Sequence, residues 1–140
     1  MYLLDTNILL EVLLGQERAE EVKQFLREAP EGQLFLSDFS LYSVGIQLFR
    51  RGAPDAFWRM VDDLILQGGV RLARLSAGQM QQMIEIAQTF RLDFDDAYQY
   101  TLAHQQRWHI VSYDTDFDRT DAGRLTPAEA IERLKRGEVR

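Results

Sequence analysis

Met1-Tyr2-Leu3-Leu4-Asp5-Thr6-Asn7-Ile8-Leu9-Leu10 opens the chain with two apolar runs on either side of Asp5. The first run predicts a buried strand, and the second predicts a helix that follows at once, capped by Asp5 or Thr6. In open parallel sheets, ligands bind beyond the carboxyl ends of the strands. The stretch therefore predicts that Asp5 lies at the mouth of a sheet.

Two later segments place acids at similar boundaries. Asp93-Phe94-Asp95-Asp96-Ala97 opens an amphipathic helix, and Ser112-Tyr113-Asp114-Thr115-Asp116 follows the strand-like Trp108-His109-Ile110-Val111. Acids at three such boundaries indicate one convergent site. Carboxylates brought together repel one another unless protons or cations neutralise them, so the expected occupant is a hard divalent cation.

The available ligand types narrow the choice of metal. The chain has no cysteine and only two histidines, His104 and His109, which removes the usual zinc ligand sets. Oxygen ligands suit Mg²⁺ or Mn²⁺. Acid-only sites of this kind typically serve phosphoryl transfer, in which metal ions activate water and neutralise charge on the leaving oxygen.

The rest of the chain follows an α/β order. The pattern predicts a helix from Glu17 to Ala29, strands at 33–36 and 70–75, a helix from Pro54 to Gly68, and a helix capped by Ser76. Strands that alternate with helices in this way predict a mainly parallel sheet. With 140 residues and no linker or repeat, the chain is expected to form a single domain, 1–140.

The composition is that of an ordinary globular domain. Asp5 ends the first apolar run, so neither a signal-peptide core nor a membrane span is expected. The lack of cysteine is compatible with the cytosol. We therefore expect a cytoplasmic protein with no membrane contact.

Three segments together resemble the acidic motifs of PIN domains, the fold of VapC-type toxin ribonucleases: residues 1–10, 92–100 and 110–118. The resemblance extends to about residues 126–129, which is nearly the whole chain. It implies a three-layer α/β/α domain with a mainly parallel central sheet. It also implies a metal-dependent ribonuclease acting on single-stranded RNA, the toxin of a toxin–antitoxin pair with an antitoxin partner, and a homo-oligomer.

The resemblance also assigns roles to individual residues. The catalytic carboxylates correspond to Asp5, Asp96, Asp114 and Asp116, and the first three are expected to bind the metal. Asn7 and Ser112 are expected to orient these ligands from behind. Water activated by one or two Mg²⁺ or Mn²⁺ ions would attack an RNA phosphodiester in line, so no side-chain nucleophile is needed.

One position departs from the family pattern. PIN nucleases usually carry a glutamate on the helix after the second strand, and Leu36-Ser37-Asp38-Phe39-Ser40-Leu41-Tyr42-Ser43-Val44 places Ser43 there. Asp38 is a partial substitute by charge, but it lies more than a helical turn before Ser43. The alternative hypothesis is therefore a catalytically weak or inactive PIN-like domain that binds RNA or a protein.

The formal net charge of −6 opposes nucleic-acid binding, because phosphate contacts depend on lysine and arginine. The acidic site accounts for part of this charge, and bound metal would cancel it. Arginine suits bidentate phosphate contacts as well as surface ion pairs. The arginines expected to contact RNA are Arg50, Arg51 and Arg119, the last because it follows the third acidic motif directly.

Each acid also has a purely structural interpretation. Asp5 is a candidate helix cap, and Asp93 and Asp96 fit a capping pair. For Asp93 the capping role is preferred, whereas the other acids around Asp96 favour a metal role for it. Asp118 and Asp121 are assigned to a solvated turn. Packing is likewise preferred over RNA stacking for the aromatic residues of this region, Tyr98, Tyr100 and Trp108.

A third hypothesis is an aspartate that becomes phosphorylated, as in receiver domains, because an acid after a first strand also serves that chemistry. Those families need a well-placed lysine as well. The chain offers only Lys23 and Lys135, both in helical segments expected to be exposed, so this hypothesis ranks below the other two.

Overall fold

A four-stranded sheet organises the structure, a computed structural model that describes residues 1–137. Within these residues the strands are β1 (Tyr2–Leu4), β2 (Leu34–Ser37), β3 (Arg71–Ala73) and β4 (His109–Val111). Their spatial order is β3-β2-β1-β4, and every neighbouring pair is parallel. The predicted parallel sheet is therefore confirmed, with β1 in its interior.

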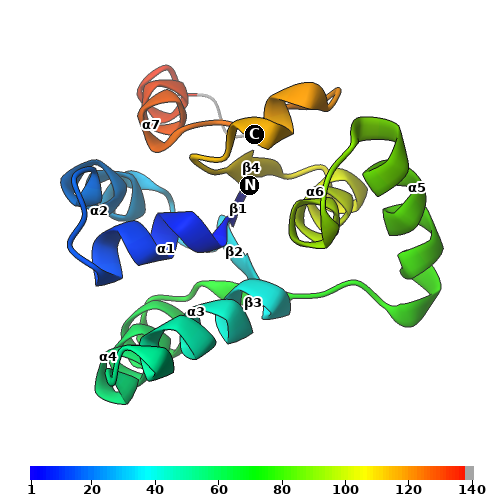
Figure 1. Cartoon of the computed structure of the whole chain (residues 1–140). Coiled ribbons are helices and arrows are strands. Elements are labelled where there is room, and N and C mark those ends of the chain that lie inside the picture. Colours follow the sequence, from blue (N-terminus) through cyan, green and yellow to red (C-terminus); the bar gives the residue numbers. More distant parts are fainter. Residues whose placement is uncertain (138–140) are drawn as a thin grey trace.

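Helices connect the strands and cover both faces of the sheet. They are α1 (Thr6–Leu13), α2 (Ala19–Glu28), α3 (Asp38–Arg50), α4 (Pro54–Met60), α5 (Met80–Phe90), α6 (Phe94–Gln106) and α7 (Pro127–Lys135). Figure 1 shows α1, α2 and α7 on one side of the sheet and α5 and α6 on the other, which is the expected three-layer α/β/α fold. None of the helices within residues 1–137 is long and apolar enough to cross a membrane.

The two faces of the sheet belong to two hydrophobic clusters. Tyr2 and Leu4 pack into the cluster that includes Phe25 of α2, whereas Leu3 packs into the cluster that includes Leu102 of α6. Successive residues of a strand point to opposite faces, so a strand covered on both sides needs apolar residues throughout. This explains why the first strand is a continuous apolar run.

The segment after α4 departs from the single helix predicted to extend from Pro54 to Gly68. Helix α4 ends at Met60, and the chain continues as a π-helix, η1 (Val61–Gln67). Two 3₁₀ helices complete the fold, η2 (Ala77–Gln79) and η3 (Thr115–Arg119). Ser76 acts as a cap as predicted, because it forms a capping box with Gln79 at the start of η2, which leads directly into α5.

The register of the strands brings polar residues to one edge of the sheet. Leu4 of β1 pairs with Leu36 of β2 and with Val111 of β4. The residues that follow these three, at the carboxyl edge of the sheet, are Asp5, Ser37 and Ser112. Ligands of open parallel sheets bind at this edge.

Candidate metal centre

Asp5 links the first strand to the first helix and is surrounded by hydrogen-bond donors. It is only 7% exposed and caps α1, with its Oδ1 accepting from Thr6 N at 2.9 Å. Gln99 Nε2 donates to the same oxygen at 3.0 Å. Oδ2 accepts from Ser112 Oγ at 2.7 Å and from Asn7 Nδ2 at 3.5 Å. Asp5 is therefore both a helix cap and a member of a polar network.

Ser112 and Asn7 connect Asp5 to the loop after β4. Ser112 Oγ accepts from Asp114 N at 2.9 Å and from Asn7 Nδ2 at 3.2 Å, while it donates to Asp5. Asn7 Oδ1 accepts from Tyr113 N at 3.2 Å. These two residues thus lie between Asp5 and Asp114 and hold the loop backbone in place.

Three carboxylates from two elements meet beside Asp5. Asp96 in α6, Asp114 and Asp116 each offer one oxygen, and these oxygens all lie within 4.8 Å of one another. Local capping orients them: Asp93 caps α6 by accepting from Asp96 N at 3.1 Å, and Asp114 caps η3 by accepting from Asp116 N at 2.8 Å. Asp116, expected only to assist, belongs to this close group, and Asp5 lies outside it.

Burial and nearby carboxylates raise the pKa values of Asp96 and Asp5. Burial, followed by the charge of Asp114, raises the pKa of Asp96 from 3.8 to about 8. Burial also raises the pKa of Asp5, although hydrogen bonds from Gln99 and Ser112 oppose that rise. At neutral pH, Asp96 therefore keeps its proton unless a cation takes its place. A close set of carboxylate oxygens with this property fits a hard divalent metal ion.

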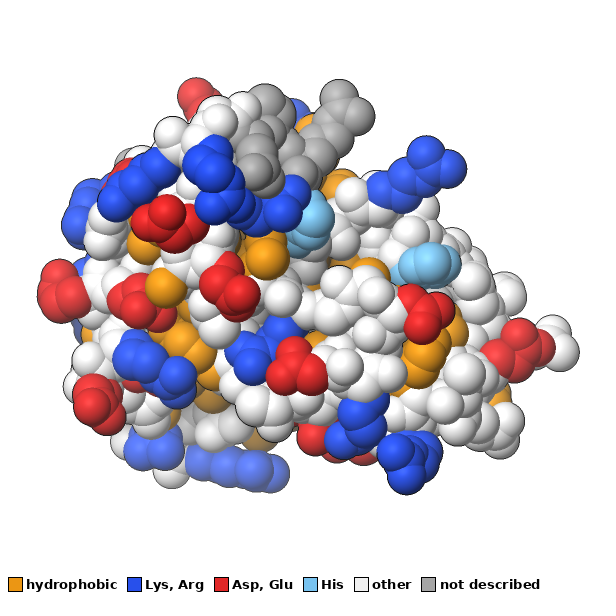
Figure 2. Space-filling model, turned by 90° about the horizontal axis from the view of Figure 1, so that it is seen from above, with side chains coloured by type: hydrophobic (Ala, Val, Ile, Leu, Met, Phe, Trp, Pro, Cys, Tyr) orange, Lys and Arg blue, Asp and Glu red, His pale blue; other side chains and the backbone are white. Residues whose placement is uncertain are grey.

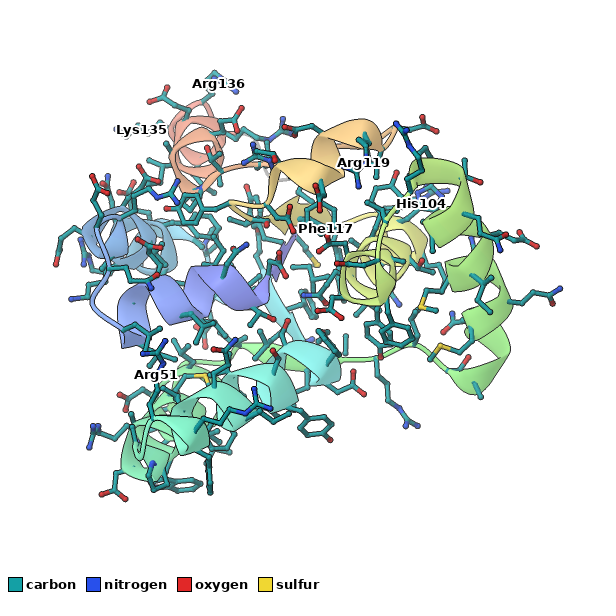
Figure 3. The ribbon with its side chains drawn as sticks, in the orientation of Figure 1. Arg51, His104, Phe117, Arg119, Lys135 and Arg136 are labelled. Atoms are coloured by element: carbon teal, nitrogen blue, oxygen red, sulfur yellow. The ribbon has the colours of Figure 1, made fainter. Side chains whose placement is uncertain are left out.

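Arg119 is engaged with the fold itself. It forms an ion pair with Asp116 at 3.0 Å, and it donates to the carbonyl oxygens of Phe90 at 3.1 Å and Arg91 at 2.6 Å, at the end of α5. Figure 3 shows Arg119 on the same side of the molecule as Phe117 and His104. Arg119 thus braces η3 against α5, and its contact with RNA stays a prediction.

Arg50 and Arg51 lie at the other end of α3 from the acids. Ser40, near the start of α3, accepts a hydrogen bond from Gln99, which also contacts Asp5. The rise of the helix places Arg50 about 15 Å further along. Figure 3 shows Arg51 well apart from Arg119. On the face shown in Figure 2, basic and acidic side chains are interspersed rather than gathered into one basic patch. RNA contact by Arg50 and Arg51 also stays a prediction.

The two positions of α3 considered as the missing acid have different surroundings. Ser43 is half-buried and lines a surface groove with Tyr42. Asp38 accepts from Tyr98 Oη at 2.7 Å, so its carboxylate is engaged in holding α3 to α6. The place of Ser43 in the metal centre stays a prediction.

The aromatic residues near the site pack against the core, and Asp118 lies in η3. Tyr98 and Tyr100 are buried, and Trp108 stacks on a neighbouring phenylalanine with ring centroids 3.9 Å apart. Asp118 forms an ion pair with Arg124 at 3.2 Å. The predicted packing role of the aromatic residues is therefore confirmed.

Gln99 and Ser40 also belong to the site, although neither was predicted there, and Thr6 was predicted only as a cap. Gln99 Nε2 donates to Ser40 Oγ at 2.7 Å, and Thr6 Oγ1 donates to the same oxygen at 2.9 Å. The available signal was a lone amide in the buried run of α6, three residues after Asp96 and thus on the same face of the helix.

The fold and the site define a class of protein: an α/β domain whose parallel sheet carries a cluster of carboxylates at its carboxyl edge. The chain belongs to the PIN domain family, whose sequence model matches residues 2–123.

Solved structures with this fold include toxins and their complexes. A toxin–antitoxin complex from Klebsiella pneumoniae matches with a TM-score of 0.71 and 24% identity, covering 91% of this chain and 98% of that one. VapC20 from Mycobacterium tuberculosis, a sarcin-ricin loop cleaving toxin, matches with a TM-score of 0.73 and 20% identity, covering 91% and 100%. FitAcB from Neisseria gonorrhoeae matches with a TM-score of 0.69 and 21% identity, covering 91% and 99%. A search of curated proteins found no match.

Proposed function

We propose that this chain is a metal-dependent endoribonuclease that cleaves single-stranded RNA and serves as the toxin of a toxin–antitoxin pair. The observation that carries this proposal is the group of Asp96, Asp114 and Asp116, with oxygens within 4.8 Å of one another beside Asp5. Membership of the PIN domain family supports nuclease chemistry. The fold shared with VapC20 and with the Klebsiella toxin–antitoxin complex supports the toxin role.

The proposed centre would hold one or two Mg²⁺ or Mn²⁺ ions through Asp5, Asp96 and Asp114, with Asp116 beside them. When bound, such ions supply Lewis acidity that activates water and neutralises charge on the phosphate. With a pKa of about 8, Asp96 carries a proton at neutral pH, and it would release that proton to the solvent on becoming a metal ligand. Ser112 fixes both Asp5 and the backbone of Asp114, so the carboxylates keep their convergent arrangement.

The proposed binding partners are RNA and an antitoxin protein. Arg50, Arg51 and Arg119 are the proposed RNA contacts, because guanidinium groups suit phosphate oxygens. The antitoxin partner and a homo-oligomeric state are proposed by analogy with the toxin–antitoxin complex that shares the fold.

The test is cleavage of a fluorescent single-stranded RNA by highly purified protein, with Mn²⁺ and with EDTA. Wild type should cleave only with metal, and Asp96→Asn should lower the rate by about 100-fold or more, since even residues behind metal ligands contribute about 10- to 100-fold. Cleavage that survives Asp96→Asn would reject the mechanism.

A second candidate function is a PIN-like domain that binds RNA or a protein without cutting it, and the serine at position 43 favours it. Ser43→Glu distinguishes the two functions in the same assay. If the absent carboxylate limits activity, Ser43→Glu should tighten Mn²⁺ binding and raise cleavage. Strong wild-type cleavage that Ser43→Glu leaves unchanged would argue against the second function.

A further inference from the structure

Gln99 joins three elements around the acidic centre. It lies on α6, is 1% exposed, and donates through Nε2 to Asp5 Oδ1 at 3.0 Å and to Ser40 Oγ at 2.7 Å. Ser40 lies on α3, and its Oγ also accepts from Thr6 Oγ1 at 2.9 Å. A single carboxamide therefore ties α6 both to α3 and to the junction between β1 and α1.

The other end of the carboxamide indicates why a glutamine occupies this position. Gln99 Oε1 is buried and has no hydrogen-bond partner within residues 1–137. A buried acceptor without a donor lowers stability, and an apolar side chain of similar shape would fill the space without that cost. The position therefore favours glutamine for its N–H groups rather than for stability.

The orientation of the amide follows from the carboxylate that it faces. If the amide were reversed, its oxygen would lie about as close to Asp5 Oδ1 as its nitrogen does now, and the two oxygens would repel. With the nitrogen toward Asp5, Thr6 N and Gln99 hold Oδ1 while Ser112 and Asn7 hold Oδ2. Donors on both oxygens fix the plane of this carboxylate.

We propose that Gln99 is a positioning residue of the metal centre, which fixes the Asp5 carboxylate in the orientation needed for metal binding and is itself anchored by Ser40. This inference rests on the proposed function. Gln99 and Asp96 lie three residues apart on α6, so the helix that supplies one acid of the centre also orients another. Residues behind metal ligands act in this way by limiting the orientations open to the ligand.

The test compares Gln99→Met with a matched control on the same helix. Methionine keeps the length of the side chain but has no N–H group. Thr101→Val is the control, because Thr101 is fully buried and its Oγ1 also lacks a partner among the residues described. Gln99→Met should weaken Mn²⁺ binding by about 10- to 100-fold in calorimetry and lower kcat for RNA cleavage, with KM changed less than about twofold. Thr101→Val should change neither.

Thermal melts in EDTA separate positioning from a merely structural role. The melting temperature of Gln99→Met should stay close to that of wild type, because the lost hydrogen bonds are offset by removal of the unpartnered Oε1. Ser40→Ala supplies a second variant in case Gln99→Met does not fold, and it should show a smaller loss of Mn²⁺ affinity in the same direction.

Each outcome decides a specific point. Mn²⁺ affinity unchanged in both Gln99→Met and Ser40→Ala, while Asp96→Asn loses binding, overturns the positioning role and leaves the proposed function standing. Affinity that falls only in step with the melting temperature marks a structural role and also overturns the proposal. If wild type binds no Mn²⁺, the proposed function and this inference fail together.

Discussion

The two parts of the acidic centre accommodate buried negative charge by different means. Asp5, delivered by β1, accepts from four groups: Thr6 N, Gln99 Nε2, Ser112 Oγ and Asn7 Nδ2. Asp96, delivered by α6, instead has other carboxylates as its main electrostatic neighbours, and the charge of Asp114 helps to raise its pKa to about 8. Hydrogen bonds hold the first carboxylate in place, whereas a proton or a cation must neutralise the second.

This difference predicts where metal and pH act. The Asp5 part is held by protein donors whether or not an ion is bound. The Asp96 part exchanges a proton for a cation, so its state depends on both concentrations. The dependence of metal binding on pH should therefore come mainly from the Asp96 part.

The largest expected effect is a steep rise of Mn²⁺ affinity with pH. Because the pKa of Asp96 is about 8, a proton competes with the ion at lower pH. Well below that value each pH unit should lower the affinity by about tenfold, and the fall between roughly pH 8 and pH 6 should be about 50-fold. Calorimetric titration across this range measures the slope. Asp96→Asn should bind Mn²⁺ weakly, and its affinity should no longer change steeply with pH. A wild-type Mn²⁺ affinity that does not change with pH would contradict this prediction.

A smaller effect, of opposite sign in the two parts, is expected for the melting temperature of the metal-free protein. The pKa of Asp96 is 3.8 in the unfolded chain and about 8 in the folded one. Between these values the folded state binds more protons, so the free energy of unfolding falls as pH rises from about 4 to 8. Asp96→Asn removes this loss in the free energy of unfolding, so it should raise the melting temperature in EDTA near pH 8 by a few degrees.

Ser112→Ala, in the Asp5 part, should instead lower the melting temperature in EDTA near pH 8. The hydroxyl is fully buried, donates to Asp5 and accepts from Asp114 N, so its loss leaves buried groups without partners. The expected cost is about 1–3 kcal/mol, or roughly 3–10 °C. Equal shifts of the same sign in Asp96→Asn and Ser112→Ala would remove the distinction between the two parts.

The smallest expected effect is the salt-dependent part of the stability lost in Arg119→Met. The ion pair with Asp116 is partly exposed, with 37% and 43% of the two side chains accessible, so its contribution to stability should be about 1 kcal/mol or less and should shrink at high salt. The hydrogen bonds to the carbonyl oxygens of Phe90 and Arg91 should add about 1–3 kcal/mol that salt changes little. Denaturant unfolding at low and high salt measures the salt-dependent part. Arg59→Met, which removes the same charge from an exposed position of α4, is the control. A salt-dependent loss in Arg119→Met well above that of Arg59→Met and above about 1 kcal/mol would contradict this prediction.

Local patterns predicted much of this structure, and distant contacts account for what they missed. The apolar run before Asp5 and the caps at Asp93 and Ser76 depend on neighbouring residues, so the sequence identifies them. Gln99 could not be assigned in this way, because its partner Ser40 lies 59 positions away in the chain. The place of Asp116 in the close group depends on the turn of η3, whose sequence alone is typical of a solvated loop.

The hydrogen bond between Ser112 and Asp5 joins residues 107 positions apart, and the bond between Gln99 and Asp5 spans 94. Contacts of such separation form only after both residues have been synthesised, and closing the long loop between them costs conformational entropy. A ribosome synthesising this chain from its N-terminus therefore presents Asp5 long before the carboxylates of α6 and η3 exist. The centre is completed only when residues 109–116 have emerged and joined the sheet, so partly made chains cannot carry its activity.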